Sequence, residues 1–137
     1  MQKLPYKIEH IGIAVNSIEE SAMVYNSLLG EESYKEEIVE TEGVRTLFFK
    51  IGESKIELLE GTSEESVISR YIKKRGEGIH HIAYAVKDIE KAVDRLKEKG
   101  FRVLGEIREG ADNKLVAFLH PKDTSGVLTE LCMDRPE

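Results

Sequence analysis

The sequence predicts an α+β fold built from two β-α-β-β-β repeats in tandem. Residues 8–15 (IEHIGIAV) recur as residues 79–86 (IHHIAYAV), which places His81 71 positions after His10. Each copy is followed by a helix-start signal, an amphipathic stretch and a glycine. A strand, a cap, a helix and a stop that repeat in this order indicate a duplicated structural unit.

The composition narrows the class of protein before any motif is considered. A chain of 137 residues, 40% hydrophobic and 34% charged, predicts a single globular domain over 1–137 with a proper core. No stretch approaches the roughly 20 apolar residues of a membrane helix, and the N-terminus has no signal pattern, so we expect neither membrane insertion nor export. The single cysteine fits the reducing cytoplasm. The net charge of −6 argues against nucleic-acid binding.

The first repeat is expected over about 6–61. In its opening strand the alternation puts Glu9 on the same face as Ile11, Ile13 and Val15, toward a helix, and puts His10 on the opposite face. Ser17 and Glu20 form a capping box for a helix that ends at Gly30, with a predicted apolar stripe of Ile18, Ala22, Tyr25, Leu28 and Leu29. Three further strands are predicted at 34–39, 44–51 and 55–60.

A helical connector at 63–75 leads to the second repeat, expected over about 77–134. The strand at 79–86 precedes a helix capped by Asp88 and stopped at Gly100. The remaining strands are predicted at 101–107, 115–119 and 127–133, with a loop at 109–113. The plan of the first repeat is thereby reproduced.

Four residues at matched positions point to chemistry. Each repeat has a histidine on its first strand, His10 or His81, and an inward-facing glutamate on its last strand, Glu57 or Glu130. A lone strand histidine is usually structural, and a lone strand glutamate usually faces solvent, but their recurrence in both repeats favours a shared ligand. Two imidazoles and two carboxylates form a mixed nitrogen and oxygen site suited to Co²⁺, Ni²⁺, Zn²⁺, Mn²⁺ or Fe²⁺.

Other reactive side chains carry weaker signals. His80 is expected to be structural, and Cys132 is expected to pack because no base is placed to activate it. His120 could bind substrate or cap a turn. Lys122 is ambiguous, and the run Lys73, Lys74 and Arg75 would ordinarily be a solvated helix end.

Over essentially the whole chain, the paired repeats with His…Glu…His…Glu resemble the vicinal oxygen chelate superfamily, which includes glyoxalase I and extradiol dioxygenases. Residues 78–83 (GIHHIA) and 115–131 (LVAFLHPKDTSGVLTEL) are similar to the methylmalonyl-CoA epimerase family within it. The resemblance implies a curved, cup-shaped mixed sheet around a metal site, with the helices outside. It also implies one divalent metal ion, an acyl-CoA substrate and a homodimer.

The resemblance places the metal ligands on His10, Glu57, His81 and Glu130. Some relatives have glutamine in place of Glu57, so this site is more similar to that of bacterial glyoxalase I. The position of a second catalytic glutamate in some epimerases corresponds here to Thr46, which cannot act as a carboxylate base.

The implied activity interconverts (R)- and (S)-methylmalonyl-CoA by proton transfer at C2 through an enolate. Glu130 and Glu57 are the expected catalytic pair, with a water relay as the alternative to Glu57. His120, Lys122, Lys73, Lys74 and Arg75 are the expected substrate-binding residues, the cations serving the Coenzyme A phosphates.

Two other functions stay open. One is a glyoxalase I-type lyase (lactoylglutathione lyase) acting on a hemithioacetal, which is also proton transfer beside a metal. The other is a non-catalytic small-molecule-binding protein of the same fold, against which the complete ligand quartet argues. An extradiol dioxygenase fits least, because two carboxylates replace its usual two-histidine, one-carboxylate pattern.

Overall fold

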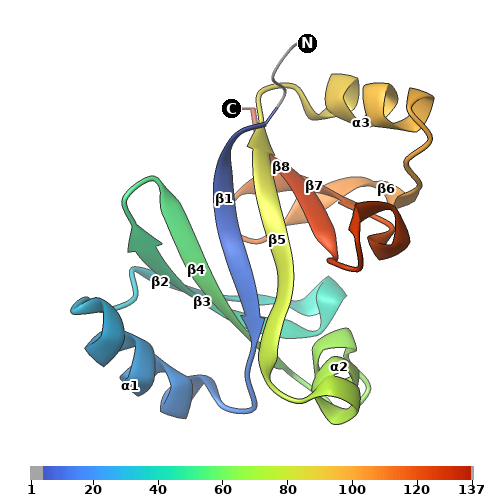
Figure 1. Cartoon of the computed structure of the whole chain (residues 1–137). Helices are drawn as coiled ribbons and strands as arrows, with labels where there is room; N and C mark the ends of the chain where they lie inside the picture. Colours follow the sequence, from blue (N-terminus) through green and yellow to red (C-terminus); the bar gives the residue numbers. More distant parts are fainter. Residues whose placement is uncertain (1–4, 137) are drawn as a thin grey trace. The chain divides into compact units, whose positions relative to one another are not determined.

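The computed structural model of the chain describes residues 5–136. Residues 1–4 and 137 lie outside the described residues. Two predictions include some of them: the single domain over 1–137 and the absence of a signal segment at the N-terminus. The predicted α+β class and the two β-α-β-β-β repeats are confirmed, with helix α2 between the repeats (Figure 1).

The first repeat contains β1 (Pro5–Ala14), α1 (Ile18–Leu29), β2 (Lys35–Val39), β3 (Val44–Ile51) and β4 (Ser54–Gly61). Helix α2 (Val67–Arg75) follows. The second repeat contains β5 (Gly78–Val86), α3 (Ile89–Glu98), β6 (Val103–Gly110), β7 (Lys114–Leu119) and β8 (Thr129–Asp134). Short 3₁₀ helices lie at Glu40–Glu42 (η1) and Pro121–Thr124 (η2).

The described residues divide into two compact units that do not coincide with the repeats. One unit, the 11–80 unit, comprises residues 11–80. The other comprises residues 5–10 together with 81–136 and is called the 81–136 unit below. Strands β1 and β5 contribute residues to both. The prediction that one domain contains repeat units at 6–61 and 77–134 stays a prediction.

In the 11–80 unit, β2, β3, β4 and β1 are hydrogen-bonded in that order, with β2, β3 and β4 antiparallel. Helix α1 begins at Ser17, whose side chain accepts a hydrogen bond from the Glu20 amide, and ends at Gly30 in the left-handed conformation. Its Ile18 packs with Leu47, Phe49 and Leu58 in one core cluster. The predicted stripe is wrong at Leu28, which is 70% exposed.

Helix α2 packs through Ile68 against Val44 and Leu59, in a second cluster of the same unit. It begins at Val67, four residues later than the predicted start at 63, and its N-cap is Ser66, whose side chain accepts a hydrogen bond from the Ser69 amide. Gly61 permits this approach, because a Cβ there would lie 2.0 Å from the Ser69 Oγ and 2.2 Å from the Ser66 Oγ.

In the 81–136 unit, the hydrogen-bonded order is β1, β5, β8, β7, β6. Strands β5 and β8 are parallel, while β7 is antiparallel to both β8 and β6, so the pairing is mixed as expected. Asp88 caps α3 by accepting from the Lys91 amide, and the helix buries Ile89 and Val93 against Leu131. The predicted loop at 109–113 is wrong at its start, because β6 continues through Gly110.

Among the described residues, no helix combines the length and the apolar character needed to cross a membrane.

Candidate metal centre

Three of the four predicted ligands meet within the 81–136 unit. His10 lies on β1, His81 on β5 and Glu130 on β8, and they are 6%, 5% and 4% exposed. The sheet order explains the meeting, because β1 neighbours β5 and β5 pairs with β8. In that parallel pairing Ala83 of β5 lies opposite Glu130 of β8. His81 is two residues before Ala83 on β5 and shares its face, so the side chains of His81 and Glu130 lie on the same face of the sheet.

The ligand atoms are spaced as the ligands of one ion would be. The Nε2 atoms of His10 and His81 are 3.0 Å apart, and the Glu130 Oε1 lies 3.3 Å from His81 Nε2 and 3.7 Å from His10 Nε2. Two atoms that each lie about 2.1 Å from a metal at a right angle are about 3.0 Å apart, and a wider angle lengthens this separation. The donor set and the convergence therefore fit a divalent metal ion, and this group could hold one.

Glu57 lies in the 11–80 unit, on β4, and is 5% exposed. It is as buried as the three residues above and stands directly opposite Phe48 of β3. Its role as the fourth ligand stays a prediction. Thr46 is also buried, and its hydroxyl donates to the Glu37 carbonyl oxygen at 3.1 Å, a structural hydrogen bond.

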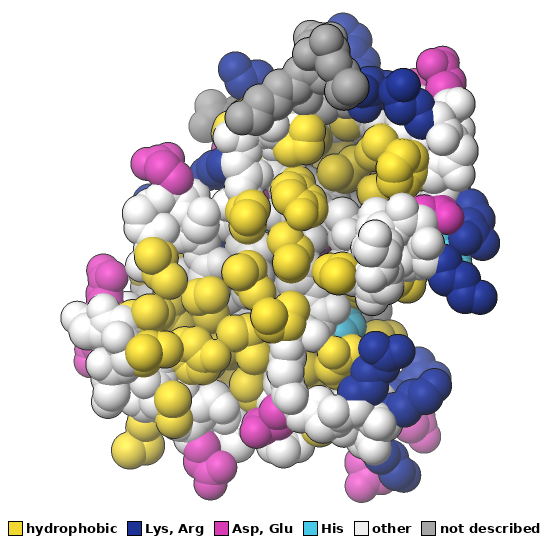
Figure 2. Space-filling view, in the orientation of Figure 1, with side chains coloured by type: hydrophobic (Ala, Val, Ile, Leu, Met, Phe, Trp, Pro, Cys, Tyr) yellow, Lys and Arg dark blue, Asp and Glu magenta, His cyan; other side chains and the backbone are white. Residues whose placement is uncertain are grey.

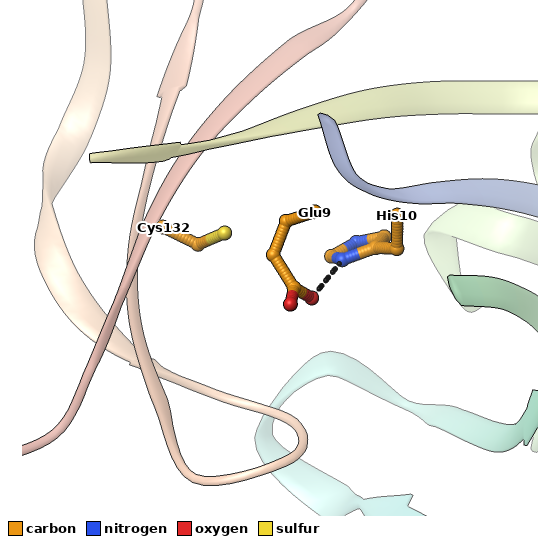
Figure 3. A group of neighbouring side chains, drawn as sticks. All are labelled: Glu9, His10 and Cys132. Carbon is orange, nitrogen blue, oxygen red and sulfur yellow. Dashed lines mark hydrogen bonds and ion pairs between the residues drawn. The ribbon is translucent and has the colours of Figure 1, made fainter. Parts of the chain in front are cut away.

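The position of Glu9 corrects the sequence analysis. The strand pattern put Glu9 on the face opposite His10, yet it is 3% exposed and its Oε1 lies 3.0 Å from His10 Nδ1 (Figure 3). Glu9, His10 and Cys132 form a second buried group whose ligand-type atoms lie close together. No sequence signal marked Glu9, because alternation along a strand does not reveal a side chain that bends toward its neighbour.

A ring contact on His81 is also absent from the sequence analysis. Phe118 of β7 lies edge-on to His81, with ring centroids 5.9 Å apart at 82°. The Arg108 guanidinium lies 5.1 Å from the centroid of Phe118. Phe118 is directly opposite Glu130 in the β7–β8 ladder, so matching the registers of the two last hairpins could have indicated it.

His120 and Lys122 lie at η2. His120 is its N-cap, since the His120 Nδ1 accepts from the Lys122 amide at 3.1 Å. The exposed Arg102 forms a bidentate ion pair with Asp123. Hydrogen bonds from the side chain and the backbone of Arg102 lower the pKa of the Asp123 carboxyl to about 2. The turn-capping alternative for His120 is thus observed, and substrate binding by His120 and Lys122 stays a prediction.

Lys73, Lys74 and Arg75 form the exposed last turn of α2 in the 11–80 unit, where Figure 2 shows a gathering of cationic side chains. The Arg75 guanidinium lies 5.8 Å from the centroid of Tyr71. The His80 ring packs edge-on to Tyr71, with ring centroids 4.9 Å apart, and its expected structural role stays a prediction. Cys132 is fully buried beside Ala83 and Val116, as expected.

Comparison with known proteins agrees with this geometry. The profile of the glyoxalase/bleomycin resistance protein/dioxygenase superfamily matches residues 9–118. The chain is 44% identical to the ethylmalonyl-CoA/methylmalonyl-CoA epimerase of Cereibacter sphaeroides over 128 residues, which cover 91% of this chain and 96% of that protein.

Solved structures give the same result. The chain is similar to methylmalonyl-CoA epimerase from Mycobacterium tuberculosis, with a TM-score of 0.94, 34% identity and coverage of 99% of this chain and 93% of that one. It is also similar to a methylmalonyl-CoA epimerase in complex with methylmalonyl-CoA and NH4+, with a TM-score of 0.91, 38% identity and coverage of 98% and 100%. The chain therefore belongs to the glyoxalase/bleomycin resistance protein/dioxygenase superfamily and, within it, to the methylmalonyl-CoA epimerase family.

Proposed function

We propose that this protein is a methylmalonyl-CoA epimerase, which interconverts the (R) and (S) forms of its substrate by proton transfer at C2 through an enolate. One observation carries the proposal: His10, His81 and Glu130 converge in a buried group, on the fold of proteins that bear this name. The bound methylmalonyl-CoA of one relative supports an acyl-CoA substrate.

The chemical difficulty is the weak acidity of the C2–H bond between a thioester and a carboxylate. One divalent ion, held by His10, His81, Glu130 and the proposed fourth ligand Glu57, would supply Lewis-acid stabilisation of the negative charge that develops when this proton leaves. Burial of these side chains excludes water and strengthens such electrostatic effects. The same ligand set suits Co²⁺, Ni²⁺, Zn²⁺, Mn²⁺ or Fe²⁺.

Two carboxylates are proposed to move the proton. Glu130, as the carboxylate, removes it from one face of C2, and Glu57, as the carboxylic acid, delivers its proton to the opposite face; after turnover Glu130 holds a proton and Glu57 is the carboxylate, so the two exchange roles in the reverse direction. Thr46 does not take part, since a hydroxyl bonded to the Glu37 carbonyl oxygen is no carboxylate base.

Substrate binding is proposed at the exposed cations. Lys73, Lys74, Arg75 and Lys122 are all exposed, and their charged groups would form charge-assisted hydrogen bonds with the anionic phosphates of Coenzyme A. His120 is proposed to hydrogen-bond the substrate through the ring nitrogen that does not cap η2. We further propose that the protein is cytoplasmic and forms a homodimer. Light scattering of the purified protein would test the dimer.

Deuterium exchange at C2 of methylmalonyl-CoA in D₂O tests the activity. The protein loaded with Co²⁺ should exchange the C2 proton and interconvert the two epimers, and a chelator should abolish both. Absence of exchange in the metal-loaded protein would overturn the proposal. Product formation from methylglyoxal and a thiol in the same preparation would then assign a lyase instead.

A further inference from the structure

Glu9 is a buried carboxylate that the proposed reaction does not use. It is 3% exposed, although the residues before it on β1, Ile8 and Tyr6, are 43% and 49% exposed. Burying an ionised carboxylate costs several kcal/mol in general. Such a buried group is therefore found only where hydrogen bonds and opposite charges compensate for this cost. The contacts of Glu9 therefore indicate why it is there.

One of these contacts fixes a ring nitrogen of His10. The Glu9 Oε1 lies 3.0 Å from His10 Nδ1, and an ionised carboxylate can only accept a hydrogen bond. The Nδ1–H group must then donate, so in the neutral ring the lone pair lies on Nε2. Nε2 is the nitrogen that faces His81 and Glu130, at 3.0 and 3.7 Å.

A cation compensates for the charge of Glu9 from the other side. The Lys114 Nζ lies 3.9 Å from the Glu9 Oε2, and Lys114 also pairs with Asp134, its cross-strand neighbour. These residues and Cys132 line a small cavity of the 81–136 unit. In Figure 3 the Glu9 side chain lies between Cys132 and the imidazole, with its carboxylate turned to the ring.

We propose that Glu9 is a positioning residue, which holds the His10 ring in one orientation and one tautomer so that Nε2 is presented as a metal ligand. The inference deepens the proposed function and rests on it only for the consequence in catalysis. Carboxylate partners of this kind typically raise metal affinity or activity 10- to 100-fold.

The test compares Glu9→Ala and Glu9→Gln with Glu109→Gln. Glu109 is an exposed glutamate of the same unit that pairs with Arg135, so its variant makes the same chemical change away from the centre. Two readouts are taken. Long-range ¹H–¹⁵N correlation spectra of the metal-free protein give the His10 tautomer, and competition with a chromogenic chelator gives the Co²⁺ dissociation constant and stoichiometry.

The wild-type His10 should be the Nδ1–H tautomer, and Glu9→Ala should shift it toward Nε2–H and weaken Co²⁺ binding about 10- to 100-fold. Glu9→Gln, which keeps the shape and an acceptor oxygen, should give a smaller loss, and Glu109→Gln should change neither readout. If Glu9→Ala does not fold, the Glu9→Gln spectra and affinity decide the matter.

An unchanged tautomer or an unchanged Co²⁺ affinity in a folded Glu9 variant would overturn the inference. So would binding of two Co²⁺ ions per chain with loss of one in Cys132→Ala, since Glu9 would then be a ligand of its own site. Neither readout depends on turnover. A wild type that binds Co²⁺ through His10 but leaves the C2 proton in place would overturn the proposed epimerase alone.

Discussion

The last hairpins of the two repeats have the same register but different surroundings. In β3–β4 the buried Glu57 stands opposite Phe48, and in β7–β8 the buried Glu130 stands opposite Phe118. Phe48 is 1% exposed and its ring lies 5.9 Å from that of Tyr34, whereas Phe118 is partly exposed and contacts a proposed metal ligand, His81. The duplicated backbone thus places a proposed metal ligand opposite an aromatic ring twice, once where the ring is fully buried and once where the ring is partly exposed and contacts His81.

The two glutamates should give the largest effects. Replacing Glu130 with Gln removes a proposed proton-transfer group and should lower kcat on the order of 10²- to 10⁴-fold, because general acid–base catalysis contributes that much. Glu57→Gln should be comparable if the hairpins are functionally equivalent. The measurement is epimerisation together with C2 deuterium exchange. A Glu57→Gln variant that retains wild-type kcat would break the equivalence and favour a water relay.

The two phenylalanines should separate stability from function. Phe48→Ala should lower the free energy of unfolding by about 3–5 kcal/mol, since it empties a buried site. Phe118→Ala should cost less stability, because part of its ring is already exposed, but should weaken Co²⁺ binding through His81. Urea unfolding and chelator competition on both variants check this. Equal stability losses would contradict the difference in surroundings.

The helix caps compare the repeats at a smaller scale. Ser17 and Asp88 each accept a hydrogen bond from the amide three residues later. Ser17→Ala and Asp88→Ala should each lower the unfolding free energy by about 1 kcal/mol. Substitution of the exposed Ser27, inside α1 and away from its cap, is the control. A much larger effect in one helix would show that its cap does more than end a helix.

The ion pair between Arg102 and Asp123 of η2 should give the smallest effect, because the Arg102 side chain is 58% exposed and surface ion pairs contribute little to stability. Arg102 lowers the pKa of Asp123 from 3.8 to about 2. A depressed carboxyl pKa stabilises the fold above its unfolded value, and this contribution is lost as the pH falls from about 4 through about 2. Unfolding of wild type and Arg102→Met at pH 6 and pH 3 checks this: the difference between them should shrink at the lower pH. A constant difference would contradict the linkage.

Local signals in the sequence were enough for most of the fold. The capping residues Ser17 and Asp88 and the strand at Val44–Ile51 lie where they were predicted, because short-range chemistry decides them. Leu28 and Gly110 were assigned wrongly, since the extent of a buried stripe and the end of a strand depend on what packs against them.

The site was predictable to the level of residue types. The repeat identified His10, His81 and Glu130, but only the sheet order brings their ligand atoms to within 3.7 Å of one another. The contact of Glu9 with His10 and that of Phe118 with His81 depend on side-chain direction across strands. Spacing along the chain does not encode that direction.

The division of β1 has a consequence for synthesis on the ribosome. Residues 5–10 of β1, which include His10, belong to the 81–136 unit. This part of β1 can therefore reach its final packing only after residues 81–136 have been synthesised. A nascent chain that ends at residue 80 contains His10 but neither His81 nor Glu130. Closing a contact over so long a separation is entropically costly and slow. The three residues of the proposed metal centre therefore come together only after the second repeat has been made, and an ion that needs all three of them could not guide the earlier steps of folding.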